Sequence, residues 1–166
     1  CYLLGRCYYF GKGVTKDYKL AFDLFSKAAE QNYADAIAFL GDCYDYGNGV
    51  EQDQQRAMEL YQKAAADGST IAQTILGKCY SSGRGVDKDI SEAFKWFKRA
   101  AEAEHSEAQV RLGLCYEYGQ GVEKNTYKAA QWYQKAADQD HEEGQCNLGC
   151  CYDNGRGVTQ DYTEAV

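Results

Sequence analysis

Apolar residues recur along the chain with a helical period, in two stripes that alternate from one end to the other. From about residue 34 to 46, one stripe follows the period of 3.6 residues that places side chains on a single helix face. Its members are Ala36, Leu40, Cys43, Tyr44 and Gly47. From about residue 54 to 67, a second stripe comprises Ala57, Leu60, Tyr61, Ala64 and Ala65. The pattern predicts two amphipathic helices joined by a short polar connection.

The same pair of stripes returns every 36 residues without an insertion. Each copy carries a Leu-Gly pair, then a Cys-Tyr pair, then a Gly-x-Gly-Val element. The Leu-Gly pairs begin at Leu4, Leu40, Leu76, Leu112 and Leu148. A fixed period of this length is the mark of a stacked repeat in which each unit buries its apolar face on its neighbours. We therefore expect an all-α fold: an α-solenoid of antiparallel helix pairs, wound in a right-handed superhelix.

The connection between the two helices has its own pattern. Gly47 suits the left-handed residue that ends a helix, and Gly49 suits a second unusual backbone angle. Val50 is the one apolar residue of the loop. A short polar residue then stands where the second helix needs an N-cap. These residues are Asp17, Asp53, Asp89, Asn125 and Asp161.

Joined together, these motifs read LGxCYxxGxGVxxDxxxAxxxYxKAA. The chain thereby resembles the Sel-one-like repeat family of tetratricopeptide-like helix-pair proteins. The resemblance covers the whole chain, and it implies a non-enzymatic scaffold or adaptor for protein–protein interactions. Two alternatives stay open: a passive structural array within a large assembly, and a β-lactam-processing enzyme of the kind suggested for a secreted, cysteine-rich branch. That branch carries a second-helix cysteine where this chain has pairs of alanines such as Ala64-Ala65.

Composition narrows the classes further. The 166 residues include 18 Lys and Arg against 25 Asp and Glu, a net charge of −7, which argues against nucleic acid as a partner. No apolar run approaches the ~20 residues that span a bilayer, so we expect no direct membrane insertion. We expect residues 1–166 to form a single repeat array. Both ends fall inside apolar stripes, and we expect the chain to be a fragment of a longer protein.

Eight cysteines invite a disulfide or metal interpretation. Five recur once per repeat on the first-helix stripe, where equivalent positions lie too far apart to bridge, and we expect them to be buried and reduced. They are Cys7, Cys43, Cys79, Cys115 and Cys151. Free thiols favour a cytoplasmic location over secretion or the ER lumen. Cys146 and Cys150 lie four residues apart and could approach one metal with His141, but a fourth ligand is missing, so we expect no metal and no cofactor.

No residue pattern indicates catalysis. The two histidines, His105 and His141, occupy one repeat position and lack partners at a catalytic-triad spacing. Trp96 and Trp132 lie on the second-helix stripe, where we expect them to pack between repeats.

Partner binding should use positions that vary between copies. The first helices of a helix-pair solenoid line its concave face, and the positions two and five residues after each repeat leucine lie off the buried stripe. They are Arg6, Tyr9, Asp42, Asp45, Lys78, Ser81, Leu114, Glu117, Cys150 and Asp153. We expect these positions to bind a protein or peptide. If that partner is basic, the acidic positions would attract it. End-to-end self-association of the array is a further expectation.

Overall fold

The computed structural model describes residues 1–158, and every regular element in that range is an α-helix. The helices are α1 (Tyr2–Phe10), α2 (Tyr18–Ala29), α3 (Ala34–Tyr46), α4 (Gln54–Ala66), α5 (Thr70–Ser82), α6 (Ile90–Glu102), α7 (Ser106–Tyr118), α8 (Thr126–Ala137) and α9 (Glu142–Asn154). The helices predicted at 34–46 and 54–67 coincide with α3 and α4 to within one residue. The predicted all-α array of helix pairs is confirmed.

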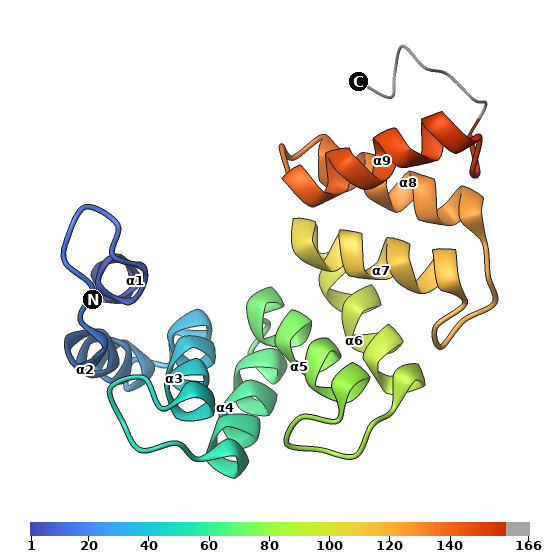
Figure 1. Ribbon diagram of the computed structural model, residues 1–166. Helices are drawn as coiled ribbons and strands as arrows, with labels where there is room; N and C mark the ends of the chain where they lie inside the picture. The colour runs from blue at the N-terminus through green and yellow to red at the C-terminus, as the bar shows by residue number, and fades with distance from the viewer. Residues whose placement is uncertain (159–166) are drawn as a thin grey trace. The chain divides into compact units, whose positions relative to one another are not determined.

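The chain divides into two compact units, and the division falls between Leu76 and Gly77 within α5. In unit 1, which begins at Cys1, α1 packs on α2, α2 on α3 and α3 on α4. In unit 2, α6 packs on α7, α7 on α8 and α8 on α9, and α7 also contacts α9. Within each unit, successive helices therefore lie side by side and reverse direction at each connection (Figure 1).

The connections follow the capping pattern of the sequence. Gly47 ends α3 in the left-handed conformation, with φ 69°, and its N–H donates to the carbonyl of Cys43. The side chains that cap the second helices each accept a hydrogen bond from the backbone N–H three residues further on, which stabilises a helix by about 1 kcal/mol. They are Asp17, Asp53, Asp89 and Asn125. The fifth expected cap, Asp161, lies outside the described residues.

The glycine of each Leu-Gly pair has a packing role that the turn glycines do not share. Gly41, Gly77 and Gly113 lie inside helices, each against an aromatic ring of the following helix. A Cβ at Gly113 would lie 2.4 Å from the Tyr133 ring, closer than any van der Waals contact allows. The missing side chain therefore lets the ring pack directly on the helix backbone. The same contact occurs at Gly5, where a Cβ would lie 2.8 Å from the Phe25 ring.

Four of the five repeat cysteines are fully buried, as predicted. They are Cys43, Cys79, Cys115 and Cys151, while Cys7 is half-buried. Burial raises the pKa of Cys43 to about 12, and the nearby Asp42 adds to the effect. All eight cysteines are free thiols in this structure. The repeat cysteines thus act as small apolar core residues with little thiolate character.

Within residues 1–158, no helix combines the length and the apolar composition needed to cross a lipid bilayer.

We expect Gly113→Ala to destabilise the fold. An alanine gains about 1 kcal/mol of helix propensity, but forcing a methyl group against the buried Tyr133 ring costs about 1–3 kcal/mol, so the clash should prevail. Thermal unfolding followed by circular dichroism measures the change. Ser91→Ala, at an exposed position of α6, is the control and should change stability by less than ~0.5 kcal/mol. A variant as stable as the parent would show that the ring–glycine contact does not constrain the packing.

Candidate partner-binding surfaces

Three of the predicted binding residues surround one hollow in unit 2. Lys78 and Ser81 come from α5 and Leu114 from α7, and together with neighbouring residues they enclose about 440 Å³. The rest of the lining is Phe97, Arg111, Cys115 and Gln120. We call the surface formed by α5, α7 and α9 within unit 2 the first-helix face. Leu114 is only partly buried there, and it packs against the core cluster that includes Val110 and Tyr133.

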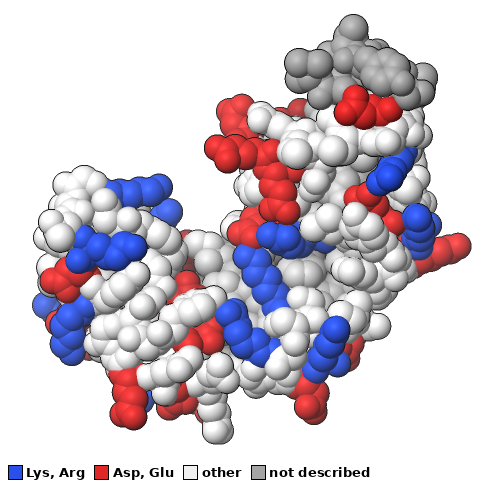
Figure 2. All heavy atoms as spheres, in the orientation of Figure 1, with Lys and Arg blue, Asp and Glu red and all other residues white. Residues whose placement is uncertain are grey.

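Ion pairs join the first helices across this face. The Lys78 ammonium pairs with Glu107, and the Arg111 guanidinium lies 3.3 Å from Glu107 and 3.4 Å from Glu143. Partial burial acts to raise the pKa of Glu107, but the hydrogen bond and charge of Lys78, together with Arg111, prevail and hold it below its ordinary value. Figure 2 shows acidic side chains gathered over the first turns of α7 and α9, with basic side chains beside them. Much of the charge on this face is thus neutralised within the chain.

Glu117 is a hydrogen-bond acceptor for the core. The hydroxyl of the fully buried Tyr133 donates to Glu117 over 2.7 Å. Arg156, from the loop after α9, pairs with the other carboxylate oxygen at 3.2 Å. Burial, and next the Glu117 carboxylate, raise the pKa of Tyr133 far above its usual value, so its hydroxyl remains a donor. Glu117 is therefore only partly exposed and has a structural role, and its part in partner binding stays a prediction.

Unit 1 repeats this arrangement with two aspartates. The hydroxyl of the buried Tyr61 lies 2.7 Å from Asp42 and 3.3 Å from Asp45. Asp45 is only 4% exposed, so the expectation that it lies off the buried surface is wrong. Because both carboxylates face a core hydroxyl, a charge reversal at Asp45 would bury an unsatisfied ammonium rather than change a surface.

The remaining predicted residues of unit 1 lie among aromatic rings. Tyr9 is half-buried, and its hydroxyl accepts a hydrogen bond of 3.0 Å from Asn48. The Arg6 guanidinium lies 5.6 Å from the Tyr2 ring and 5.7 Å from the Phe39 ring. Both side chains therefore contribute to packing between the first helices of unit 1.

A signal in the sequence could have identified these structural carboxylates. The second-helix ring that packs on the glycine is Tyr61 or Tyr133 in two repeats and Phe25 or Phe97 in the other two. The position five residues after the repeat leucine is acidic in the tyrosine repeats, as Asp45 and Glu117. In the phenylalanine repeats it is uncharged: Tyr9 and Ser81. Each repeat with a buried tyrosine hydroxyl thus also has a carboxylate that accepts its hydrogen bond.

The last two predicted residues, Cys150 and Asp153, are exposed on α9. Burial, with a smaller effect from the neighbouring Cys146, raises the pKa of the Cys150 thiol. Among residues 1–158, no three His, Cys, Asp or Glu side chains gather closely enough to hold a metal ion. His105 is instead the N-cap of α7, where its Nδ1 accepts from the N–H of Ala108, and His141 occupies the same position before α9.

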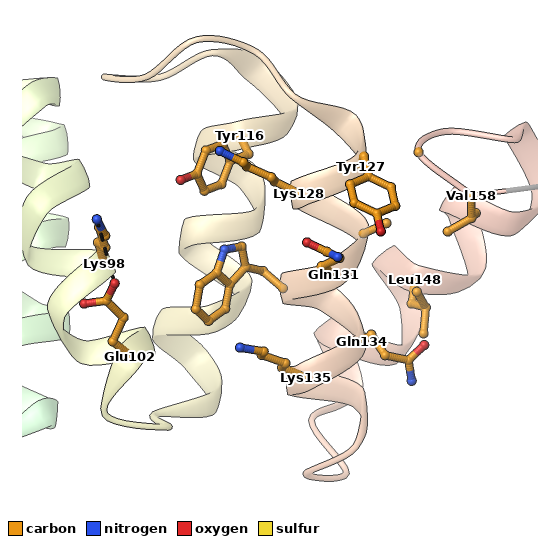
Figure 3. A pocket seen from close by; sticks show the side chains of 13 residues that line it. Lys98, Glu102, Tyr116, Tyr127, Lys128, Gln131, Gln134, Lys135, Leu148 and Val158 are labelled. Atoms are coloured by element: carbon orange, nitrogen blue, oxygen red, sulfur yellow. Dashed lines mark ion pairs between the residues drawn. The ribbon is translucent and has the colours of Figure 1, made fainter.

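The second helices of unit 2 form another hollow, which the sequence did not lead us to expect. Trp132 packs against the core of α6 and α7, as predicted, but it is only partly buried and lines a hollow of about 660 Å³ (Figure 3). Lys98, Glu102, Lys128 and Lys135 lie around it. The spacing of Lys128, Trp132 and Lys135 along one helix face could have signalled this site.

The capped helix pairs, the fixed period and the aromatic–glycine contacts together define a helical-repeat protein. The sequence matches the Sel1 repeat over residues 1–33, 34–69, 70–105, 106–141 and 142–166. The chain therefore belongs to the Sel1 repeat family. Proteins of this family are in general non-enzymatic adaptors that mediate protein interactions.

Solved structures agree with this assignment. The chain is 39% identical, with a TM-score of 0.82, to a protective antigen present in uropathogenic Escherichia coli strains that displays an SLR fold. It is 37% identical, with a TM-score of 0.87, to a Sel1 repeat protein from Oxalobacter formigenes. The two matches cover 99% and 98% of this chain, which spans 35% and 66% of the respective proteins. Cysteine rich protein B of Helicobacter pylori is 26% identical, with a TM-score of 0.62, over 78% of this chain and 92% of that protein. No curated protein matches the chain.

We expect Tyr133→Phe to destabilise unit 2, because it leaves the partly buried Glu117 without its hydroxyl donor. A hydrogen bond to a charged group contributes about 1.5–3 kcal/mol, and the remaining Arg156 pair should keep the loss near the lower end. Adding Glu117→Ser restores the combination found naturally at Phe97 and Ser81, so the double variant should recover part of the loss. Urea unfolding of the four proteins of this double-mutant cycle measures the coupling. Additive effects would show that the two residues do not interact.

We expect the stability contributed by Glu107 to depend on pH in the acidic range. Its pKa in the folded chain lies below its ordinary value of 4.5, so the stabilisation is present above pH 4.5 and is lost as the pH falls through the folded pKa. The difference in melting temperature between the parent and Glu107→Gln should therefore be largest near neutral pH and shrink in acid. Glu59→Gln, at an exposed position of α4, is the control. A difference that stays constant from pH 7 to about pH 3 would contradict the assignment.

Proposed function

We propose that the chain is an adaptor that holds a protein segment on the first-helix face of unit 2, with an apolar side chain of that segment seated beside Leu114. The observation that carries the proposal is the hollow between α5, α6 and α7, which combines an apolar floor with a polar rim. Membership of the Sel1 repeat family supports an interaction role in general.

The composition of the hollow separates it from the rest of the array. Four copies of the Leu114 position carry a charged or thiol side chain: Arg6, Asp42, Lys78 and Cys150. Only the copy at residue 114 is aliphatic, and it lines the hollow together with the buried Phe97. A partly buried apolar side chain inside a polar rim is typical of the anchor point of an interface.

The contacts of the rim define the chemistry of the partner. Ser81 and Gln120 offer a hydroxyl and an amide, whereas Lys78 and Arg111 are already paired with carboxylates of the same face. The acidic positions Asp45 and Glu117 serve the core tyrosines. We therefore propose an apolar residue flanked by hydrogen-bonding groups, and we do not require the partner to be basic.

We expect Leu114→Glu to remove partner binding while the fold is retained. The substitution places a carboxylate at the apolar centre of the hollow, where an interface residue that anchors binding contributes about 2 kcal/mol or more, or about 30-fold in affinity. Affinity purification of the parent and the variant from the same lysate, with quantitative mass spectrometry, measures which proteins are lost.

Gln55→Glu is the matched control, because it makes the same change of charge at an exposed position of α4 in unit 1. Circular dichroism should show the same helix content for all three proteins. Proteins captured by the parent and by Gln55→Glu but lost with Leu114→Glu would support the proposal. Identical captured sets for the parent and Leu114→Glu would refute it.

A further inference from the structure

A second groove in unit 2 lies between the second helices α6 and α8. We call it the second-helix groove and define it by Lys98 and Glu102 of α6, Tyr116 of α7, and Lys128, Trp132 and Lys135 of α8. In Figure 3, the Lys128 and Lys135 side chains extend from α8 toward α6, with Tyr116 beyond the end of Lys128. The groove is part of the hollow of about 660 Å³ that continues over α8 to Leu148 and Val158.

Trp132 is an apolar anchor point inside this groove. It lines both the 660 Å³ hollow and a neighbouring hollow of about 530 Å³. A partly buried indole that packs against the core and also lines two hollows offers a large apolar area at little cost in conformational entropy. Tryptophan is among the residues most enriched at the energetic centres of interfaces.

Two positive charges flank the indole without a compensating carboxylate. The Lys135 ammonium lies 4.3 Å from the Trp132 ring centroid, and the Lys128 ammonium lies 5.4 Å from the Tyr116 ring centroid. Neither makes an ion pair within residues 1–158. Lys98, by contrast, pairs with Glu102 at 3.8 Å. In a chain of net charge −7, the groove carries three lysines and one glutamate and is locally positive.

We propose that the second-helix groove binds an acidic peptide segment that carries an apolar side chain, which contacts the Trp132 indole. Its carboxylates would pair with Lys128 and Lys135. These lysines are seven residues apart on one face of α8, a rise of ~10 Å along the helix. An extended chain spans that distance in about three residues. The preferred segment therefore has two acidic residues three positions apart with an apolar residue between them.

The geometry of the groove favours a peptide over a nucleic acid. Single-stranded nucleic acids also stack on aromatic rings, but their continuous phosphate charge requires a basic track along the protein. Here Glu102 lies within the groove, and Asp138 and Glu104 line the adjoining hollow. A peptide can place its few carboxylates at the two lysines and avoid these acids.

The proposal is independent of the hollow beside Leu114, since that hollow and the second-helix groove have no lining residue in common. Occupied together, they would let the chain hold two different partners at once. An adaptor with a single face could not do so.

The test selects a random peptide library displayed on phage against the immobilised chain, and measures the affinity of the enriched peptides by fluorescence anisotropy. We expect these peptides to contain the pair of acidic residues around an apolar residue. Their dissociation constant should rise at least about 10-fold with Trp132→Ala and with the double variant Lys128→Glu, Lys135→Gln. It should also rise with salt, because exposed charge pairs are screened.

Matched controls identify the surface. Trp96→Ala removes the equivalent indole of α6, and Leu114→Glu disrupts the first-helix face; both should leave the dissociation constant within about 2-fold. The lysine variant keeps the core intact, so it tests the groove even if Trp132→Ala lowers stability. The proposal is overturned if no peptide is enriched, if the enriched peptides lack carboxylates, or if neither groove variant weakens their binding. Binding of a fluorescein-labelled oligodeoxythymidine that is lost with Trp132→Ala would also overturn it.

Discussion

The contact between a helix glycine and an aromatic ring is the constraint on which each helix pair depends. At Gly41, Gly77 and Gly113, the ring of the second helix lies where a Cβ would otherwise be. This contact brings the two helices of a pair close together and buries the ring almost completely. Because protein interiors are close-packed, the residues around each ring must fill the space beside it and must accept a hydrogen bond from its hydroxyl where the ring is a tyrosine. The alternation of Tyr and Phe at this position, and of acid and neutral residues beside it, follows from that requirement.

The same constraint determines which variable positions are available for recognition. Where the ring is a tyrosine, its hydroxyl needs an acceptor, and Asp45 or Glu117 provides it. Where the ring is Phe97, the matching position, Ser81, is released from this role and lines a hollow with Leu114. Variation between repeats therefore has two sources, core hydrogen bonding and surface chemistry, and only the second concerns a partner.

The two faces of unit 2 differ in chemistry for reasons that are local. On the first helices, acidic side chains in the first turns interact favourably with the positive end of the helix dipole. The same carboxylates pair with Lys78 and Arg111, so charge is balanced within the face. On α8, Lys128 and Lys135 lie over aromatic rings instead of carboxylates, so their charge remains available. The first-helix face has an apolar site with a polar rim, whereas the second-helix groove is aromatic and positively charged. The two surfaces therefore suit different partners.

The sequence by itself determined the repeat, the helix boundaries, the caps and the buried cysteines, because these depend on periodicity and on local backbone chemistry. The helix at Ala34–Tyr46 and the caps at Asp17 and Asp53 could be read from spacing alone. Only the tertiary structure decided that Asp45 is buried and that the partly buried Trp132 lines a hollow. The period of a helix tells on which face of that helix a side chain lies. It does not tell which residues of a neighbouring helix pack against that face. Burial and exposure at such positions are set by neighbours some 16 to 39 residues away in the chain, such as Tyr61 for Asp45 and Arg156 for Glu117.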